Sequence, residues 1–456
     1  MKFDEPIVAQ ATPYGVSAIG IIRLSGNDIF QIVDKFFQPK NGISVQNQKH
    51  KTVNLGYIID ENEIVDEVLV TKFKAPHSYT GQDLVEISCH GSPVILNRVV
   101  HIALKNGCRS ATPGEFTLRA FLNGKIDLSQ AEAIADLIAS ESDAARRVAM
   151  QQLRGGFSNE LKQLRQQLIN FVSLIELELD FSEEDVEFAD RKQLLELIDI
   201  IIEKLSKLVN SFRYGNAIKN GINVAIVGEP NVGKSTLLNT LLNEDKAIVS
   251  EIPGTTRDYI EDTITINGIL FRFIDTAGLR HTTDTIEVLG IERSIEMIKR
   301  SEIVLYVVDV LALSESHYFE HISEHLKGKK VIIVVNKIDK KSTDIDLSIF
   351  RGYPIVEISA KQKINLDKLH KALVEATEQN VYSQEQIVIT NIRHYEALKN
   401  CLDSALKVRE AIESNISPEL LTFDIRYMLE QMGEITGEIT NDEILGNIFK
   451  NFCIGK

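Results

Sequence analysis

The feature that most constrains this chain is the segment 228–235, which reads GEPNVGKS and has the spacing of a phosphate-binding loop. It follows the strand-like run 222–227 and precedes the helical run 237–239. Glycines in such a loop let the backbone turn its N–H groups toward phosphates, while Lys234 adds a positive charge and Ser235 offers a magnesium ligand. The segment therefore predicts a nucleotide-binding α/β domain.

Four further segments follow in the order found in guanine-nucleotide-binding domains. Residues 255–256 (TT) occupy the place of a switch segment, and 275–278 (DTAG) end a strand-like run, where an acidic side chain can bind magnesium through water. Residues 336–339 (NKID) follow an apolar run, and their Asp339 can accept hydrogen bonds from the ring N–H and amino group of guanine, which adenine lacks. Residues 359–361 (SAK) offer a backbone N–H to the guanine oxygen. The joint match predicts GTP binding.

The residue after DTAG departs from Ras-like proteins, which have a water-orienting Gln at this position. This chain has Leu279, whose apolar side chain cannot orient water, so another group must do so. Asp284, Glu287 and Glu292 are the acidic candidates nearby. Composition alone favours a solvated helix charge for each of the three.

The spacing of apolar residues divides the rest of the chain. Residues 1 to about 120 alternate short β-rich runs with turns and one helical stretch, 93–105, which is typical of an α+β domain. From 129 to 214 apolar residues recur every three to four positions, as in amphipathic helices. Residues 222–377 return to buried strand-like runs separated by helices, the pattern of a parallel α/β sheet, and helical spacing resumes from 393 to 452. The β-rich runs of the first part are 18–22, 67–71 and 84–88.

A helical region that is interrupted by an α/β unit indicates an inserted domain, because insertion succeeds where chain ends lie close together at a surface. The two helical segments should then pack as one domain. The acidic run 182–185 is interpreted as a solvated turn and helix start. We predict an N-terminal domain of residues 1–120, a discontinuous helical domain of 121–215 and 381–456, and an inserted GTPase domain of 216–380.

Charge and composition restrict the partners of the chain. The formal net charge of -15 repels phosphate backbones, so a nucleic-acid substrate needs a local basic patch or a partner protein that holds it. Residues 1–6 lack an apolar stretch of signal-peptide type, and no later apolar run approaches the roughly 20 residues that span a bilayer. We therefore expect a cytoplasmic protein without membrane contact. The scattered cysteines lack a Cys-x-x-Cys pair, which favours buried thiols over a zinc site or a disulfide framework.

With these motifs the chain closely resembles the MnmE (TrmE) family of bacterial tRNA modification GTPases. The resemblance runs from 7–13 to the terminal 452–456 and covers essentially the whole chain. It implies a multidomain fold with an α+β folate-binding domain, an α-helical domain and an inserted α/β Ras-like GTPase domain. The most distinctive pieces, which generic GTPases lack, are PGEFT at 113–117, RAFLNGK at 119–125, QAEAIADLI at 130–138 and the ending CIGK.

The resemblance also implies a reaction and its partners. Members of the family work with the flavoprotein MnmG (GidA), which carries FAD, in a heterotetramer. They use GTP hydrolysis and a tetrahydrofolate one-carbon unit, 5-formyl or methylene, to build an aminomethyl or carboxymethylaminomethyl group on carbon five of the wobble uridine of certain tRNAs. The N-terminal domain would bind the folate and form the homodimer.

Four positions match the family's folate contacts: Arg23, Glu86, Lys125 and the C-terminal Lys456. Glu86 can pair with the guanidine-like edge of the pterin, and the cationic side chains can meet carboxylates or the carbonyl of the carried group. Without the family, Arg23 and Lys125 would be interpreted as ordinary exposed charges.

The resemblance further implies two metal ions. Ser235 and Thr256 match the magnesium ligands, and Asn231 matches the side-chain ligand of an activating potassium ion. A monovalent cation there can replace the charge of an arginine finger. The family commonly has Thr where Ser250 stands, which still fits potassium if the ligand is a backbone carbonyl. The positions that complete the potassium shell are Ser250, Ile252 and Thr255.

Glu287 matches the family's catalytic acid, which would position the attacking water through a bridging water, and Lys234 completes the catalytic pair. Cys453 matches the family's terminal cysteine. Because it lies near Phe449 and Phe452 in the sequence, a buried apolar residue is the first interpretation and a reactive thiol the second. The predicted GTP contacts are Gly228, Asn231, Val232, Gly233, Lys234, Ser235, Thr236, Ser250, Glu251, Ile252, Pro253, Gly254, Thr255, Thr256, Asp275, Thr276, Ala277, Gly278, Asn336, Lys337, Asp339, Ser359, Ala360 and Lys361.

The mechanism that the resemblance implies is a homodimer whose GTPase domains associate across their switch loops with GTP and potassium, hydrolyse GTP and separate. One alternative is a ribosome-assembly or signalling GTPase that acts only as a switch, whose mark would be an RNA-binding module with a basic face. Folate binding would discriminate the two. Another is an interaction protein with a degenerate nucleotide site, against which the intact Lys234, Asp275 and Asp339 argue.

Overall fold

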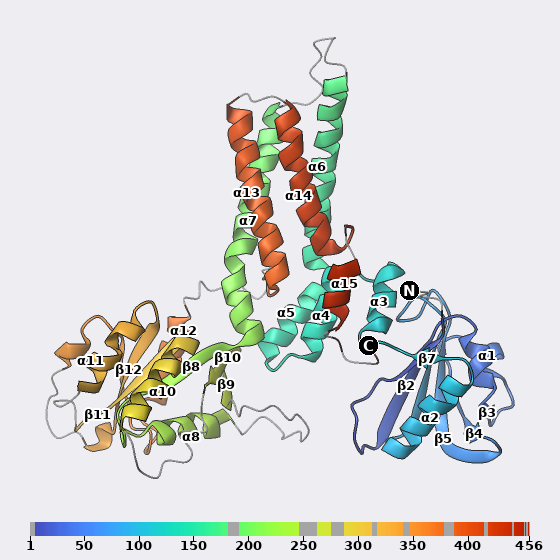
Figure 1. The fold of residues 1–456 in the computed structure, drawn as a ribbon, viewed down its shortest axis with the longest axis horizontal. Helices are drawn as coiled ribbons and strands as arrows, with labels where there is room; N and C mark the ends of the chain where they lie inside the picture. Colours follow the sequence, from blue (N-terminus) through green and yellow to red (C-terminus); the bar gives the residue numbers. More distant parts are fainter. Residues whose placement is uncertain are drawn as a thin grey trace. The chain divides into compact units, whose positions relative to one another are not determined.

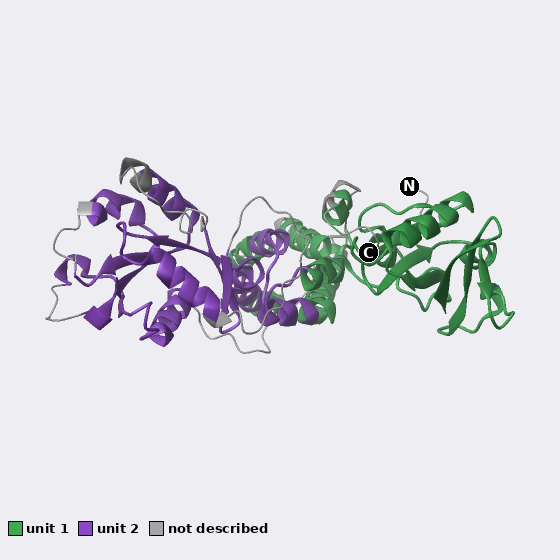
Figure 2. Cartoon of the chain, turned by 90° about the horizontal axis from the view of Figure 1, so that it is seen from below, with its two compact units in different colours: residues 1–138, 151–201, 400–456 green, residues 139–150, 202–399 purple. Residues whose placement is uncertain are grey.

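The protein forms two compact units (Figure 2). Unit 1 contains residues 1–138, 151–201 and 400–456, and unit 2 contains residues 139–150 and 202–399. Within them, the computed structural model describes residues 5–180, 191–245, 262–274, 287–311, 317–340, 347–377, 387–414, 418–439, 442–450, 452 and 455.

Unit 1 begins with a seven-stranded sheet of order β3-β4-β5-β6-β2-β1-β7, in which only the β1–β7 pair is parallel. Apolar residues of one face pack against helices α1 (Ile29–Asp34) and α2 (Pro93–Lys105) in a single core. The predicted β-rich runs and the helix at 93–105 are confirmed. The strands are β1 Ile7–Gln10, β2 Ile19–Ser25, β3 Phe37–Pro39, β4 Val53–Asp60, β5 Glu63–Phe73, β6 Leu84–His90 and β7 Arg109–Ser110.

The alternation of side chains along these strands decides what the other face of the sheet carries. In β2, Ile22 and Leu24 belong to the core, so Arg23 between them points to the opposite face. In β6, Val85 and Ile87 do the same for Glu86. Arg23 and Glu86 are directly paired in the register of β2 and β6. The face without α1 and α2 therefore carries a charged pair.

Helices make up the rest of unit 1 (Figure 1). α6 and α14, which come from the two separate helical segments of the sequence, pack side by side: Arg165 contacts the carbonyl of Leu429 at 3.3 Å and Glu438 at 2.6 Å. The helices expected from the apolar spacing are therefore present, and one from each segment packs against one from the other. Besides α1 and α2, the described α-helices that lie wholly or partly in unit 1 are α3 Glu115–Leu122, α4 Leu128–Ile138, α5 Asp143–Leu153, α6 Gly156–Asp180, α7 Arg191–Asn220, α13 Ile392–Glu413, α14 Pro418–Thr436 and α15 Asp442–Lys450.

Unit 2 is built on a six-stranded sheet of order β13-β12-β11-β8-β10-β9. α8 (Lys234–Asp245) and α12 (Leu366–Ala376) contribute to the core on one face, while α10 (Glu287–Arg300) and α11 (His317–Ser323) contribute to the core on the other. The strands are β8 Ile222–Val227, β9 Asp262–Ile266, β10 Ile269–Phe273, β11 Ile303–Asp309, β12 Lys330–Asn336 and β13 Ile355–Glu357.

One strand departs from the predicted parallel sheet: β9 pairs antiparallel with β10 at the edge. The two are joined by Asn267 and Gly268, whose φ angles are 52° and 84°. Two central residues with positive φ form the tight hairpin that Asn-Gly favours, and so short a connection permits only antiparallel strands. The Asn-Gly dipeptide was the signal in the sequence.

The α/β part of unit 2 begins and ends at two segments that are distant in the sequence but in contact in space. Ser211 in α7 accepts a hydrogen bond from the backbone N–H of Ile389 at 3.1 Å, and the rings of Phe212 and Tyr395 stack with centroids 4.4 Å apart. A Cβ on Gly215 would lie 2.0 Å from the carbonyl oxygen of Ile389. Such proximity of the two connections is what an inserted sequence requires.

Candidate nucleotide site and a charged site on the N-terminal sheet

The phosphate-binding loop connects β8 to α8 at the carboxyl edge of the unit 2 sheet. Gly228, Asn231 and Gly233 have φ angles of 150°, 63° and 100°. A Cβ on Gly228 would lie 2.2 Å from the carbonyl oxygen of Val307, and one on Gly233 would lie 2.4 Å from Nδ2 of Asn336. Both glycines are thus required by their neighbours as well as by their backbone conformation.

Lys234 is the first residue of α8 and folds back over the loop. Its Nζ donates hydrogen bonds to the carbonyl oxygens of Gly228 at 2.7 Å and Glu229 at 2.6 Å. Burial lowers the pKa of Lys234 to about 8, against a smaller opposing effect of the Glu229 carboxylate. The ammonium group therefore lies against the phosphate-binding loop, beside the first turn of α8 that carries Ser235 and Thr236.

Asn336, at the end of β12, holds two other loops together. Its side chain is buried, with 3% exposure. Nδ2 donates to the carbonyl oxygen of Val232 at 2.9 Å, and Oδ1 accepts from the backbone N–H of Ala360 at 3.0 Å. Thr240 of α8 adds a bond from its hydroxyl to the carbonyl oxygen of Ala360 at 3.0 Å. The phosphate-binding loop, NKID and SAK segments therefore meet at one edge of the sheet.

The other two polar residues of NKID are also held in place. Lys337 donates from Nζ to the carbonyl oxygen of Asn231 at 2.7 Å and forms an ion pair with Asp309 at 2.6 Å. Asp339 accepts a hydrogen bond from the hydroxyl of Ser359 at 2.5 Å. Asp309 was not predicted from the sequence. Its position at the end of the apolar strand β11, at this edge of the sheet, is the feature that could have indicated it.

Several predicted site residues lie outside the described part of the chain. They include 250–256, 275–278, Leu279 and Asp284. Residue 275 directly follows Ile274, whose N–H donates to the carbonyl oxygen of Val224 at 3.1 Å, so the described chain leads to the same edge of the sheet. α10 begins at Glu287, and Glu292 in that helix is exposed. Lys361, after Ala360, is also exposed.

A second charged site lies on the N-terminal sheet. Arg23 contacts Oε1 of Glu86 through Nε at 2.9 Å and through its terminal nitrogen at 2.8 Å. The guanidinium carbon lies 5.2 Å from the ring centre of Tyr79 and 5.8 Å from that of Phe116. Another terminal nitrogen donates to the carbonyl oxygen of Gly455 at 3.1 Å. The structure thus brings the C-terminal segment to the Arg23–Glu86 pair.

Lys125 contacts the loop that carries Tyr79, next to the Arg23–Glu86 pair. Its Nζ donates to the carbonyl oxygen of Pro76 at 3.1 Å, and Pro76 and Tyr79 belong to the connection between β5 and β6. The side chain of Lys125 is exposed. Lys456 and Cys453 lie outside the described residues.

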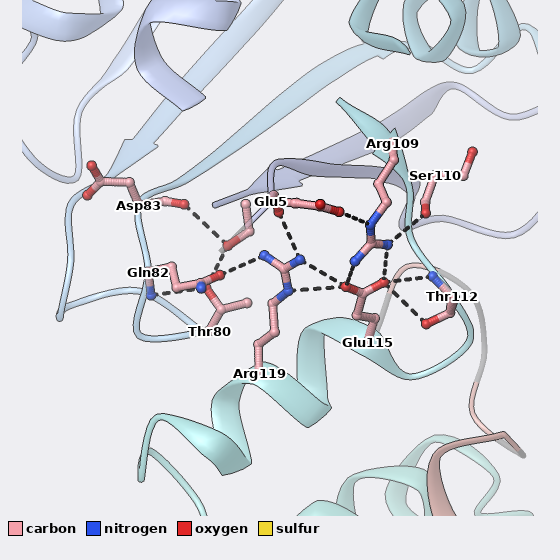
Figure 3. A network of polar contacts seen from close by, with 10 residues as sticks. Glu5, Thr80, Gln82, Asp83, Arg109, Ser110, Thr112, Glu115 and Arg119 are labelled. Carbon is pink, nitrogen blue, oxygen red and sulfur yellow. Dashed lines mark hydrogen bonds and ion pairs between the residues drawn. The ribbon is translucent and has the colours of Figure 1, made fainter. Parts of the chain in front are cut away.

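The distinctive PGEFT and RAFLNGK segments contain a buried ion-pair network (Figure 3). Glu115 accepts hydrogen bonds from Arg109 at 2.6 Å and from Arg119 at 2.9 Å, and the N–H of Thr112 donates to it at 2.9 Å. Arg119 is fully buried and also donates to Gln82 at 2.9 Å. Burial by itself would raise the pKa of Glu115, but these bonds outweigh it and lower the pKa to about 2. Part of the family signature is therefore structural.

The three described cysteines are buried, as predicted: Cys89, Cys108 and Cys401. Burial raises the pKa of each thiol to about 12, which keeps it protonated and unreactive at neutral pH. Among the described helices, none combines the length and the apolar composition that crossing a membrane requires.

Comparison with known proteins gives the family. Residues 6–125 match the model described as GTP-binding protein TrmE N-terminus, and residues 128–453 match the MnmE helical domain. The tRNA modification GTPase MnmE of Flavobacterium psychrophilum is 51% identical over 462 residues, which cover 100% of both chains. That of Bacteroides thetaiotaomicron is 53% identical and covers 99% of this chain and 100% of the relative. The solved structure of Era with MgGDPNP and nucleotides of 16S ribosomal RNA is 28% identical, with a TM-score of 0.27, over 40% of this chain and 66% of its own.

The two family models together match residues 6–125 and 128–453, so they span the N-terminal sheet, the helices and the α/β part described above. An N-terminal sheet, a helical part and a phosphate-binding α/β part occur in one chain, and the nucleotide motifs of the α/β part converge at one edge of its sheet. The relatives span essentially the entire sequence. This chain therefore belongs to the MnmE family of tRNA modification GTPases.

Proposed function

We propose that this GTPase acts with the flavoprotein MnmG and uses a tetrahydrofolate one-carbon unit to install an aminomethyl or carboxymethylaminomethyl group on carbon five of a tRNA wobble uridine. Full-length similarity to tRNA modification GTPases is the observation that carries this proposal. The reaction would take place in the cytoplasm, where tRNA is available. We assign the boundaries near residues 120, 215 and 380 to the folate-binding, helical and GTPase parts.

In the proposed nucleotide site, Lys234 neutralises phosphate charge and Asp339 binds the guanine edge. The bond from Ser359 to Asp339 and the two bonds of Asn336 support this assignment, because they fix the base-binding loops relative to the phosphate-binding loop. A pre-formed site loses little conformational entropy when the nucleotide binds.

Oxygen donors fit the two cations that we assign to the site. Ser235, in the first turn of α8, would hold magnesium with Thr256. Asn231 would hold potassium, together with Ser250, Ile252 and Thr255. Asn231 is exposed, and its backbone carbonyl oxygen accepts a hydrogen bond from Lys337. This bond holds the backbone of Asn231 in its conformation at φ 63°. The magnesium ion would polarise the phosphates, and potassium would stabilise the charge that develops on them.

Glu287 is the residue that we assign to positioning of the attacking water, since Leu279 cannot do so. It is the first residue of α10, next to the segment that begins with residue 275. A carboxylate that holds water by hydrogen bonds contributes orientation and need not touch the phosphate itself. Cys453 has no role in the GTPase step of this proposal, and a reactive thiol at this position stays a separate hypothesis.

The folate is assigned to the Arg23–Glu86 pair. The two contacts that Arg23 makes with Glu86 both use Oε1 of the carboxylate. We assign the other oxygen, Oε2, to the guanidine-like edge of the pterin. The rings of Tyr79 and Phe116 beside Arg23 offer apolar surface to an aromatic ligand. Lys125 and Lys456 would bind its carboxylates. Homodimerisation through this part of the chain belongs to the same proposal.

The deciding experiment measures GTP turnover in potassium and in sodium buffer for the wild type, Asn231→Ala and Glu287→Ala. We expect potassium to accelerate the wild type, Asn231→Ala to lose this response, and Glu287→Ala to bind GTP but hydrolyse it at least 100-fold more slowly. Equal turnover in sodium together with a fully active Glu287→Ala would favour the GTPase that acts only as a switch. Binding of 5-formyltetrahydrofolate, and its loss in Glu86→Gln, tests the folate part separately.

A further inference from the structure

A cluster of basic residues lies at one end of the β4–β5 strand pair. It consists of Lys49, His50, Lys51, Lys74 and His77, and we call it the basic patch. All of them are exposed except His50, which is partly buried. On a chain with a formal net charge of -15, a local group of this sign is unexpected. It provides the kind of local positive surface that an acidic protein needs in order to bind a phosphate backbone.

Backbone and ring contacts hold the two segments of the basic patch together. The N–H of Lys51 donates to the carbonyl oxygen of Lys72 at 2.8 Å, and the N–H of Lys74 donates to Nδ1 of His50 at 3.0 Å. The ring centroids of His50 and His77 lie 6.0 Å apart. The patch is therefore a fixed feature of the fold, in which residues 49–51 and 74–77 form one surface.

The electrostatics of the basic patch agree with this geometry. Burial lowers the pKa of His50, and the positive charges of Lys51, His77 and Lys72 lower it further. Lys72 itself is buried, and its Nζ donates to two backbone carbonyls of residues 46 and 48. The acids that act on Lys72 are Asp34 and Asp83, whose carboxylates accept backbone hydrogen bonds from Val45, Gln46 and Ala75. Lys49, Lys51 and Lys74 of the basic patch are exposed to solvent, in contrast to the buried Lys72.

The basic patch borders the loop that connects to the proposed folate site. His77 lies in the β5–β6 connection, two residues before Tyr79, whose ring lies under Arg23. Pro76 in the same connection accepts the bond from Lys125. An RNA whose backbone contacts the patch would therefore have a nucleotide close to the proposed one-carbon donor.

We propose that the basic patch binds the phosphate backbone of the tRNA substrate. This inference rests on the proposed function, because it takes the tRNA to the part of the chain where the folate is assigned. Lysine contacts to phosphates position an RNA without reading its sequence, and each contact makes affinity depend on salt. A polyglutamate tail on the folate is the other anion that the basic patch could bind. A small ligand bound at Arg23 and Glu86, however, does not need lysines from two segments at the end of the sheet.

The test compares two triple variants of the full chain. The patch variant carries Lys49→Gln, Lys51→Gln and Lys74→Gln. The control variant carries Lys35→Gln, Lys327→Gln and Lys368→Gln, which remove the same charge from three exposed lysines elsewhere. Fluorescence anisotropy with a labelled tRNA transcript that has uridine at the wobble position gives Kd between 50 and 200 mM salt. GTP hydrolysis and binding of 5-formyltetrahydrofolate show that both variants are folded.

We expect the patch variant to bind the tRNA roughly 10-fold or more weakly than the wild type at 100 mM salt, with a slope of log Kd against log salt that is smaller by about 2 to 3. The control variant should stay within about twofold of the wild type. The inference is overturned if patch and control variants bind alike, or if the wild type does not bind the tRNA at 50 mM salt. It is also overturned if the patch variant loses only its preference for polyglutamylated over monoglutamyl folate.

A modification assay separates this inference from the function on which it rests. If the wild type with its flavoprotein partner modifies the tRNA and the patch variant performs like the control, only the basic patch is wrong. If the wild type and its partner leave the wobble uridine unmodified, the proposed function fails, whatever the binding data show.

Discussion

At the scale of single residues, the polar side chains of the nucleotide site bind mainly to the backbone of neighbouring loops. Asn336, Lys337 and Lys234 each donate to a carbonyl oxygen of the phosphate-binding loop. Their contribution is therefore to hold the loop in a conformation with three positive φ angles. Substitutions at Asn336 or Lys337 should disturb phosphate binding as well as base recognition.

The first residue-scale prediction concerns Lys234. Its pKa of about 8 reflects burial, and nucleotide phosphates beside the ammonium group must raise that pKa. Affinity for GTP is then highest below pH 8 and falls as pH rises above 8, by up to about tenfold per pH unit. Calorimetry in two buffers of different ionisation enthalpy should detect proton uptake on binding that is clearly larger at pH 8.5 than at pH 7. Lys234→Arg, which cannot deprotonate, should bind without proton uptake; equal uptake at both pH values in the wild type would contradict the prediction.

The second residue-scale prediction concerns Glu115. Its folded-state pKa is depressed from 4.5 to about 2, so its contribution to stability is fully present above pH 4.5 and is lost as pH falls through 2. That contribution amounts to roughly 3 kcal/mol. Urea unfolding at pH 7 should find Glu115→Gln less stable than the wild type by about this amount, and the difference should shrink to less than half at pH 3. A difference that does not change with pH would mean that Glu115 stabilises the fold through its shape alone.

At the scale of elements, the sheet of unit 2 shows how a local signal overrides a general pattern. Buried apolar runs predict parallel strands, and five of the six strands follow this prediction. β9 does not, because the two residues Asn267 and Gly268 leave no room for the crossover that a parallel pair needs. The turn residues therefore decide the direction of the strand.

The element-scale prediction uses two glycines that both lie in helices. In α7, a Cβ on Gly215 would lie 2.0 Å from the backbone oxygen of Ile389, which cannot move aside without moving its segment. In α15, a Cβ on Gly446 meets open space. Gly215→Ala should destabilise unit 2 by about 1 to 3 kcal/mol, whereas Gly446→Ala should be neutral or stabilise by up to about 1 kcal/mol. Chemical denaturation monitored by circular dichroism measures both; equal effects would show that the α7 contact is loose.

At the scale of the whole molecule, the chain has two compact units, each with cores of its own. Proteins of this kind commonly unfold in more than one transition. A ligand raises the stability of the unit to which it binds, by about 2.7 kcal/mol at a free concentration 100 times its Kd.

The whole-molecule prediction is that calorimetric unfolding shows two transitions with different ligand responses. GTP with magnesium should raise the transition of unit 2, which carries the phosphate-binding loop, and leave the other within about 1 °C. 5-Formyltetrahydrofolate should raise the transition of unit 1 if the folate assignment is right, and Arg23→Gln should remove that response. A single transition that both ligands raise equally would mean that the units unfold together.

Much of the fold and of the nucleotide site follows from the sequence by itself. Each of the nucleotide motifs, namely the phosphate-binding loop, NKID and SAK, is one contiguous segment, so its residue types and their spacing indicate its chemistry. Apolar periods of two and about 3.6 residues distinguish strands from helices. The family resemblance added Arg23 and Glu86 as two of the positions that match the family's folate contacts, but the residues that neighbour each of them in the sequence do not indicate a site.

Only the tertiary structure decided which distant residues meet. Arg23 pairs with Glu86, 63 residues away, and with Gly455, 432 residues away. Strand register sets the first contact, and the packing of Phe449 and Phe452 against α4 brings the C-terminal segment into unit 1. The same holds for the Asp309–Lys337 pair, the buried Glu115 network and the basic patch. Such contacts depend on how strands align and helices pack, and these are properties of the whole chain that no short stretch of sequence contains.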